Sequence, residues 1–416
     1  MYNGSHQLTR RSFVRLGGAS AAALSLFPSL PSVAAEEDAL LKEAIDKLEY
    51  LTPIERAFIL DKGNTGIAKL PPEKAREIGQ APETWSLEVV PDTASGSIVE
   101  KSFSLASGNA LNWDGLMKMA DAHAVRFMHV TTCTNSENPF HISLWEGVPL
   151  REIVWLTQPK DNVRRVYYQS YHQEGRAPFQ SSLAMGQILE SAQGDMPVIL
   201  AYKMNGQAIP ASHGGPVRVI VPGSYGSKSI KWVRRIVLTN EFKANDTDAD
   251  PNFNNDPENA LKTRARFINP PKEVSSDKPI ALTGMAQIGI AGLRSVQYCV
   301  QSRQDPKSSL PADDPSWSKA DWKDAAILPP PQNWGGGLPE GKLPETNQTN
   351  PATGNPVEWP LRYLIVHWAA LIPALPAGSY DLCCRTIDGN GIAQPMPRTF
   401  PRTGHNTLHV VPLIVK

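Results

Sequence analysis

The sequence has few cysteines, no excess of either charge, and no long apolar run in its interior. Its 416 residues contain four cysteines, and their spacing suggests no disulfide framework. Lys and Arg together number 41, as do Asp and Glu, which gives no support to a nucleic-acid partner or an anionic membrane surface. Past the N-terminal region no stretch reaches the roughly 20 apolar residues of a membrane span. These absences predict a neutral globular protein without a stable membrane span.

The cysteines fall into two groups. Cys299, Cys383 and Cys384 lie in apolar stretches, and adjacent cysteines rarely bond to each other, so we expect these three to be core residues of strands. Cys133 stands alone after the stretch RFMHVTT. No cysteine lies in a C-x-x-C-H motif, so the chain has no site for covalent haem attachment.

Residues 1–35 have the pattern of a twin-arginine export signal. Arg10 and Arg11 precede a short apolar stretch, Gly17–Leu30, which small residues follow. A membrane anchor is the alternative, but prolines interrupt the stretch and it is shorter than the roughly 20 residues of a span. The twin-arginine route exports folded proteins, so we expect a periplasmic protein that takes up a tightly bound cofactor before export.

Periodicity predicts an α+β protein of two domains after the signal. Strands and helices interleave over 36–265, whereas 270–416 shows strands and turns typical of an all-β sandwich. The Pro- and Gly-rich stretch 305–360 is expected to be a long surface insertion. Helices are expected at 38–50 and 183–192. Strands of the first domain are expected at 85–90, 126–132, 151–157, 164–171, 197–204, 217–222 and 231–239.

A glycine-rich turn with several cations follows one of these strands. In HGGPVRVIVPGSYGSKSIKWV, residues 213–233, the strand ends at Pro222-Gly223, and the basic side chains of the segment include His213, Arg218, Lys228 and Lys231. Exposed N–H groups and clustered cations suit a phosphate. A hairpin with a solvated basic face has the same pattern, so this segment alone leaves both interpretations open.

This segment resembles the molybdopterin-binding segment of the sulfite oxidase family. Two upstream stretches support the resemblance: VTTCTNSENPF followed by LWEGVPLREIV, and ILAYKMNGQAIPASHGGPVR. The similarity covers roughly residues 80–240, and LPAGSYDLCCRTIDGNGIAQP resembles the family's immunoglobulin-like dimerisation domain. The resemblance implies a mixed α/β molybdopterin-binding domain followed by an immunoglobulin-like sandwich, in a homodimer.

The resemblance also implies roles for individual residues. Cys133 would supply the single protein thiolate to one molybdenum per chain. His141 is assigned from its nearness to Cys133 in the sequence instead: it either faces the active site or is an ordinary polar residue of the core or surface. Arg294 would contribute a cation across the domain interface, and Lys228 would be a rim charge. The residues that would bind the pterin and its phosphate are His213, Arg218, Lys231, Gly223 by close approach, and Ser229 and Ile230 through their backbone N–H groups.

In the family a small sulfur compound is oxidised by two electrons, which leave singly to a haem. Because this chain has no haem site, its electron partner is expected to be a separate protein such as a c-type cytochrome. The chain departs from the family pattern after the metal cysteine, where 134–138 lacks the usual arginine, and near Lys62, where another arginine is missing. The interdomain tyrosine has no counterpart either.

These departures keep three functions open. The first is a periplasmic sulfite dehydrogenase or related enzyme. The second is a sulfoxide reductase, since an uncharged substrate would suit the missing arginines. The third is a non-catalytic cofactor-binding relative, which the presence of Cys133, His213, Arg218 and Lys231 disfavours.

Overall fold

The fold is described from a computed structural model of the chain. The described residues are 31–59, 66–133, 141–172, 177–192, 194–247, 259–303, 305, 308–335, 338–350, 352–395 and 406–416, without the side chains of 31–38 and 339. The twin arginines and apolar stretch of the predicted signal therefore lie outside the described residues, as do Lys62 and the loop 134–140.

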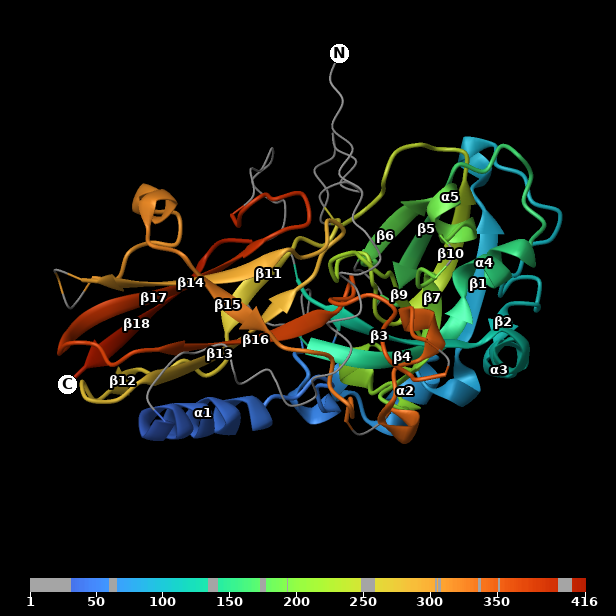
Figure 1. Cartoon of the computed structure of the whole chain (residues 1–416). Coiled ribbons are helices and arrows are strands. Elements are labelled where there is room, and N and C mark those ends of the chain that lie inside the picture. Colours follow the sequence, from blue (N-terminus) through green and yellow to red (C-terminus); the bar gives the residue numbers. More distant parts are fainter. Residues whose placement is uncertain are drawn as a thin grey trace, which may run out of the picture.

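Two five-stranded sheets form the N-terminal half of the molecule (Figure 1). Both contribute to one apolar core, because Val89 and Ile236 of the first sheet are buried in the same cluster as Leu200 and Val219 of the second. The first sheet has the order β2 (Leu111–Asn112), β1 (Ser86–Pro91), β10 (Val233–Thr239), β5 (Arg165–Ser170), β6 (Gln180–Ala184). The second has the order β3 (Val125–Thr131), β4 (His141–Pro149), β7 (Ile199–Met204), β8 (Gln207–Ala208), with β9 (Arg218–Ile220) paired to β7.

Short helices connect and cover these sheets: α2 (Pro72–Glu77), α3 (Trp113–His123), α4 (Leu150–Trp155) and α5 (Met185–Leu189). The strand predicted at 151–157 is wrong, because Leu150, Ile153 and Val154 are buried at the i, i+3, i+4 spacing of a helix. The helix predicted at 183–192 is shorter than expected and begins after β6.

The C-terminal part is an eight-stranded arrangement around its own core. Residues of β13 and β17 lie in that one core cluster, and β11 contacts β17, so two layers of strands pack face to face. Strand β15 pairs with β14 through Lys323–Ala325 and with β16 through Ala326 and Ile327, and so joins the layers. The order is β11 (Arg264–Phe267), β13 (Ile280–Gln287), β16 (Ile365–Ile372), β15 (Lys323–Ile327), β14 (Ser295–Ser302), β17 (Gly378–Ile387), β18 (His409–Val415), β12 (Glu273–Val274).

The predicted α+β fold class is confirmed by this mixture of helices and sheets. Helix α1 (Pro31–Asp46) lies along β13 and β16, below them in Figure 1. Cys299, Cys383 and Cys384 are buried free thiols on β14 and β17, as predicted. No helix in the described part of the chain has the length and apolarity of a membrane span. The immunoglobulin-like identity of the C-terminal part stays a prediction.

The prediction that 305–360 is only a surface insertion is wrong. The segment supplies β15, and its side chains Trp317 and Trp334 are each 3% exposed. Asn347 lies against β3, where its amide accepts a hydrogen bond from the Met128 N–H and donates one to the Met128 carbonyl. The segment contributes to the core because a few large side chains anchor an otherwise Pro- and Gly-rich path.

Candidate functional site

The pair of strands β3 and β4 separates two environments. On one face Met128, Val130, Ile142 and Leu144 are buried in an apolar cluster. Because side chains alternate along a strand, the residues between them point to the other face. That face is apolar at one end and polar at the other: Phe127 and Trp145 are followed by His129, Thr131, His141 and Ser143.

The polar end carries buried groups that have no hydrogen-bond partner among the described residues. These are His129 Nδ1, Thr131 Oγ1, His141 Nδ1 and Ser143 Oγ, together with Thr132 Oγ1 and Arg218 Nε. Gly223 donates its N–H to His129 Nε2 at 3.1 Å, so neutral His129 carries its proton on Nδ1. Burying a polar group without a partner costs about 1–3 kcal/mol, and so many together indicate a place for a ligand.

The glycine-rich turn, residues 213–231 with β9 inside it, adds cations to the same place. Arg218 is buried, lies 5.2 Å over the Trp145 ring, and donates to the carbonyls of His213 (2.6 Å) and Ser229 (2.7 Å). Lys231 donates to the Ser212 carbonyl at 2.7 Å. Gly214 has φ +100°, and a Cβ there would lie 2.6 Å from the Lys231 side chain, so this glycine is required for the turn. The two ends of the turn are thereby held together around the buried guanidinium.

The electrostatic environment of this cluster is one-sided. Burial, followed by the charge of Arg218, lowers the pKa of His129 to about 3. The same two causes, in the same order, are the largest at His141 and lower its pKa to about 3 as well. Burial, then Lys231 and Arg218, lower the pKa of His213 to about 4. Among the described residues, every charged group that acts on these three rings is a cation or another histidine. A site with this charge pattern suits an anionic ligand.

The low pKa of His129 predicts a pH-dependent stability. Its folded pKa lies below the ordinary value of about 6.5, so its contribution to stability is complete above that pH and declines as the pH falls toward 3. We expect the cofactor-free protein to be destabilised relative to His129→Gln by up to about 1.4 kcal/mol per pH unit in this window. Urea unfolding of both proteins at several pH values below about 6.5 would measure it. Parallel profiles would contradict the assigned pKa.

Cys133 follows β3 at the polar end of the cluster. It is partly exposed, and the preceding Thr132 accepts a hydrogen bond at 2.7 Å from the Gly226 N–H of the cation-bearing turn. His141 lies opposite Thr131 at the start of β4. The thiol, the histidines and the turn therefore come from segments that the sheet brings together. Among the described residues no group of three or more His, Cys, Asp or Glu could hold a metal ion.

Lys228 is not the rim charge that the sequence suggested. Its side chain is 1% exposed and lies 2.6 Å from Asp246 Oδ2, and it also donates to the Ser182 carbonyl. The carbonyl of Lys228 accepts from the Tyr168 hydroxyl at 2.9 Å. Lys228 is buried because Asp246 neutralises it, and the pair fixes the turn to the first sheet.

The structure gives Gly223 and Ser229 roles different from those expected. The N–H of Gly223 is used by His129, and a Cβ at Gly223 would lie 2.7 Å from the ring of Tyr363. The N–H of Ser229 donates to the Gly226 carbonyl at 3.1 Å, so the turn itself uses it. The hydrogen bonds of the turn leave the Ile230 N–H unused within the described residues. Of the two N–H donors that the sequence assigned to the cofactor, Ser229 and Ile230, the Ser229 N–H is already used within the turn.

Arg294 lies apart from the cluster. It is exposed on the loop between β13 and β14, and that loop reaches the turn through two main-chain hydrogen bonds, Ile290 to Leu261 and Leu261 to Gly223. No described contact joins its guanidinium to the histidines, so its catalytic role stays a prediction. His129 and Tyr363 were missed; a histidine within the apolar strand RFMHV was the signal that could have found His129.

Comparison with known proteins identifies the domain. The family model described as "Oxidoreductase molybdopterin binding domain" matches residues 77–246, which contain β1–β10 and the cluster. Residues 77–246 form a molybdopterin-binding oxidoreductase domain. The prediction of a molybdopterin-dependent oxidoreductase of the sulfite oxidase type is confirmed at the level of this domain.

The curated relatives of the molybdopterin-binding domain include enzymes of two kinds, nitrate reductases and a sulfite oxidase. A nitrate reductase [NADPH] of Beauveria bassiana is 31% identical over 99 residues, which are 24% of this chain and 11% of that protein. The sulfite oxidase of Gallus gallus is 34% identical over 99 residues, 23% of this chain and 21% of that protein. The chain thus matches a tenth to a fifth of the length of these relatives.

A solved structure shares the fold over most of the chain. The sulfane dehydrogenase SoxCD from Paracoccus pantotrophus aligns over 88% of this chain and 82% of its own, with a TM-score of 0.58 and 16% identity. At that identity the likeness shows the fold alone.

The residues of the cluster fit a molybdopterin cofactor. The buried donors without partners, His129 Nδ1–H and Arg218 Nε–H, are of the kind that an anionic pterin with a phosphate accepts from. A thiolate of Cys133 would be a soft ligand of the kind that suits molybdenum. The chemistry of the donor set and the family of the domain therefore agree.

Proposed function

We propose that the protein is a molybdenum-cofactor enzyme that oxidises sulfite or a related small sulfur compound. The observation that supports this most directly is the buried cluster of His129, His141, His213 and Arg218, which has unpaired donors and on which none of the described acids acts. The names of a sulfite oxidase and a sulfane dehydrogenase among the similar proteins support a sulfur substrate. We further propose export to the periplasm, a homodimer, and transfer of electrons to a separate carrier such as a c-type cytochrome.

Each residue would have a defined task in this reaction. When bound, the cofactor supplies two-electron oxygen-atom transfer. Cys133 would hold the metal as a thiolate at the mouth of the cluster. Arg218 would orient the pterin while its other N–H groups hold the carbonyls of His213 and Ser229. Lys231 would meet the phosphate, with Ser212 keeping the ammonium in place.

Reduction of a neutral substrate is the second candidate. The cations of the described cluster, Arg218 and Lys231, already have carbonyl partners in the turn, and the arginines expected to grip a small dianion are absent from 134–138 and from the region of Lys62. A sulfoxide carries no net charge and would need fewer cations. Because nitrate reductases are among the relatives, nitrate belongs in the same test.

We expect Arg294→Ala to distinguish a charged from a neutral substrate. If sulfite is oxidised, Arg294 is the cation that the sequence prediction assigns to it across the domain interface. Its loss should then raise KM for sulfite about tenfold or more, the effect of losing one charged hydrogen bond. Rising salt should also lower sulfite activity, since the Debye length is about 10 Å at 0.1 M. Steady-state kinetics with sulfite, a methionine sulfoxide and nitrate would measure these effects.

Arg235→Ala is the matched control for this experiment, because Arg235 is an exposed arginine on β10 that pairs loosely with Glu88. It should leave KM for every substrate unchanged. Turnover of the sulfoxide, with no sulfite-driven reduction of a cytochrome, would reject sulfite oxidation in favour of the reductase.

A further inference from the structure

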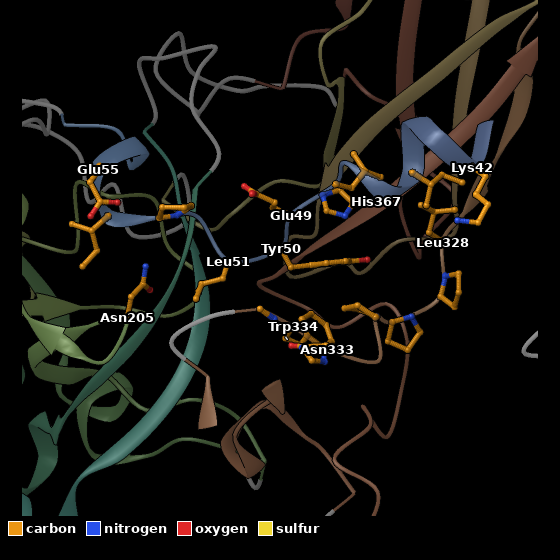
Figure 2. A pocket seen from close by; sticks show the side chains of 18 of the residues that line it. Lys42, Glu49, Tyr50, Leu51, Glu55, Asn205, Leu328, Asn333, Trp334 and His367 are labelled. Carbon is orange, nitrogen blue, oxygen red and sulfur yellow. Dashed lines mark hydrogen bonds between the residues drawn. The ribbon is translucent and has the colours of Figure 1, made fainter. Parts of the chain in front are cut away.

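A cavity lies on the opposite side of β3 and β4 from the cofactor cluster. It has a volume of about 800 Å³ and lies between the end of α1, the loop after it, and the segment 328–335 (Figure 2). Tyr50 and Trp334 line it, and both belong to the apolar cluster that contains Met128, Val130 and Ile142. This volume is within the range of pockets that hold small organic molecules.

His367 on β16 lines this cavity and is an unusual buried group. Its side chain is 1% exposed, and neither ring nitrogen has a hydrogen-bond partner among the described residues. Burial lowers its pKa to about 4, so the ring is neutral at neutral pH, with one N–H donor and one acceptor nitrogen. Two unsatisfied polar atoms in an apolar wall destabilise the empty protein, which is expected where a ligand completes the site.

The walls of the cavity favour a flat, uncharged ligand. Tyr50 lies between His367 and Trp334 (Figure 2). The centroid of its ring is 4.2 Å from that of His367 and 4.9 Å from that of Trp334. The residues Pro329–Pro331 and Leu328 form the other side. The charges at the rim are exposed and have partners of their own: Lys42 pairs with Asp46 at 2.5 Å, and Glu49 pairs with Arg56. The cavity therefore offers aromatic and proline surfaces, and no buried charge for an ion.

One wall of the cavity also reaches the cofactor cluster. Thr52 donates its N–H to the Ile142 carbonyl and accepts from the Ile142 N–H, next to His141. The main chain of Ile54 hydrogen-bonds the ring of His213. A ligand in the cavity would thus contact a segment that holds two histidines of the cluster.

We propose that this cavity binds a neutral aromatic molecule with a hydroxyl group on its ring. The hydroxyl oxygen would be hydrogen-bonded to His367, and the aromatic rings would lie against Tyr50 and Trp334. The inference goes beyond the proposed oxidoreductase function and does not depend on it. A hydroxyl on the ligand could donate to one nitrogen of His367 or accept from the other, so a phenol-type oxygen matches either orientation of the ring.

Calorimetric titration of the full protein with 2-naphthol and with naphthalene tests the proposal. The oxygen contributes one hydrogen bond, so we expect 2-naphthol to bind about tenfold more tightly than naphthalene. A tenfold difference in affinity corresponds to about 1.4 kcal/mol of binding free energy. His367→Phe should abolish this difference by weakening 2-naphthol alone. It should also leave the melting temperature unchanged or higher, because it removes two unsatisfied polar atoms. Lys47→Ala, at an exposed residue just after α1 that is not among those lining the cavity, should bind both probes like the original protein.

Ile45→Trp supplies a second variant should His367→Phe fail to fold. Ile45 is a partly buried residue of α1 that lines the cavity, and a larger side chain there should reduce the affinity of both probes. The proposal is overturned if neither probe binds, or if His367→Phe retains the preference for 2-naphthol. A crystal structure in which another segment of the chain fills the cavity would overturn it as well.

Discussion

Replacing Cys133 with Ala is expected to abolish turnover while leaving the protein folded. The thiol is partly exposed at the end of β3, and its removal leaves no buried partner unsatisfied, so stability should change little. Activity should fall by more than the 10–100-fold that follows loss of an outer partner of a metal ligand, roughly a thousandfold or more. Steady-state activity and metal content per chain would measure the effect.

Pterin content gives the variant a second readout. The donors His129, Arg218 and Lys231 remain in Cys133→Ala, so the pterin should stay bound while activity is lost. Cys299→Ala is the control, since Cys299 is a buried thiol on β14 and should have full activity. Full turnover by Cys133→Ala would remove the ligand assignment.

Asp246→Asn is expected to cause the largest loss of stability among single substitutions near the cluster. It would leave the Lys228 ammonium, 1% exposed, without its carboxylate at 2.6 Å. Removing one partner of a buried ion pair lowers the free energy of unfolding by about 3–5 kcal/mol. Because Lys228 lies next to Ser229, whose carbonyl holds Arg218, cofactor content should fall as well. Urea unfolding and pterin content after purification would measure both effects.

The pair can be separated from its surroundings by a double-mutant cycle. Lys228→Met combined with Asp246→Leu removes both charges, and the double variant should be much more stable than the sum of the single changes predicts. Lys160→Met is the control for an ion pair of the same type at the surface, where Lys160 and Glu100 are about half exposed and the expected loss is about 0–1 kcal/mol. Additive losses in the cycle would contradict the importance of the pair.

Sequence patterns predicted most strands because their periodicity reflects burial on one or two faces. The strand mistaken at 151–157 shows the limit. REIVWLT is rich in β-branched and aromatic residues, and its helix is only six residues long, fewer than two turns, so the helical spacing of its apolar residues does not repeat. The segment 305–360 was misread for a related reason. Its composition is that of a loop, and the packing of Trp317 and Trp334 depends on strands far away in the sequence.

The cluster was only partly predictable. Cys133, His213, Arg218 and Lys231 were found through a resemblance, since their types and spacing alone also fit a solvated turn. His129 was missed because it sits in an apolar strand, and its function depends on which face it shares with His141. Lys228 was misjudged because nothing near it in the sequence reveals its partner, Asp246, which lies 18 positions further along the chain.

The contact between Asn347 and Met128 also constrains the order in which the molecule can be completed. Strand β3 lies at the end of its sheet, so its outer edge has no neighbouring strand; Asn347 and the Tyr363 carbonyl occupy that edge instead. These partners are more than 200 positions further along the chain. A chain synthesised only as far as β10 would therefore expose an unpaired edge, open to joining another molecule, beside the strand that carries His129 and leads to Cys133. Once it has folded, the C-terminal half thus covers this edge and protects the cofactor-binding half from aggregation.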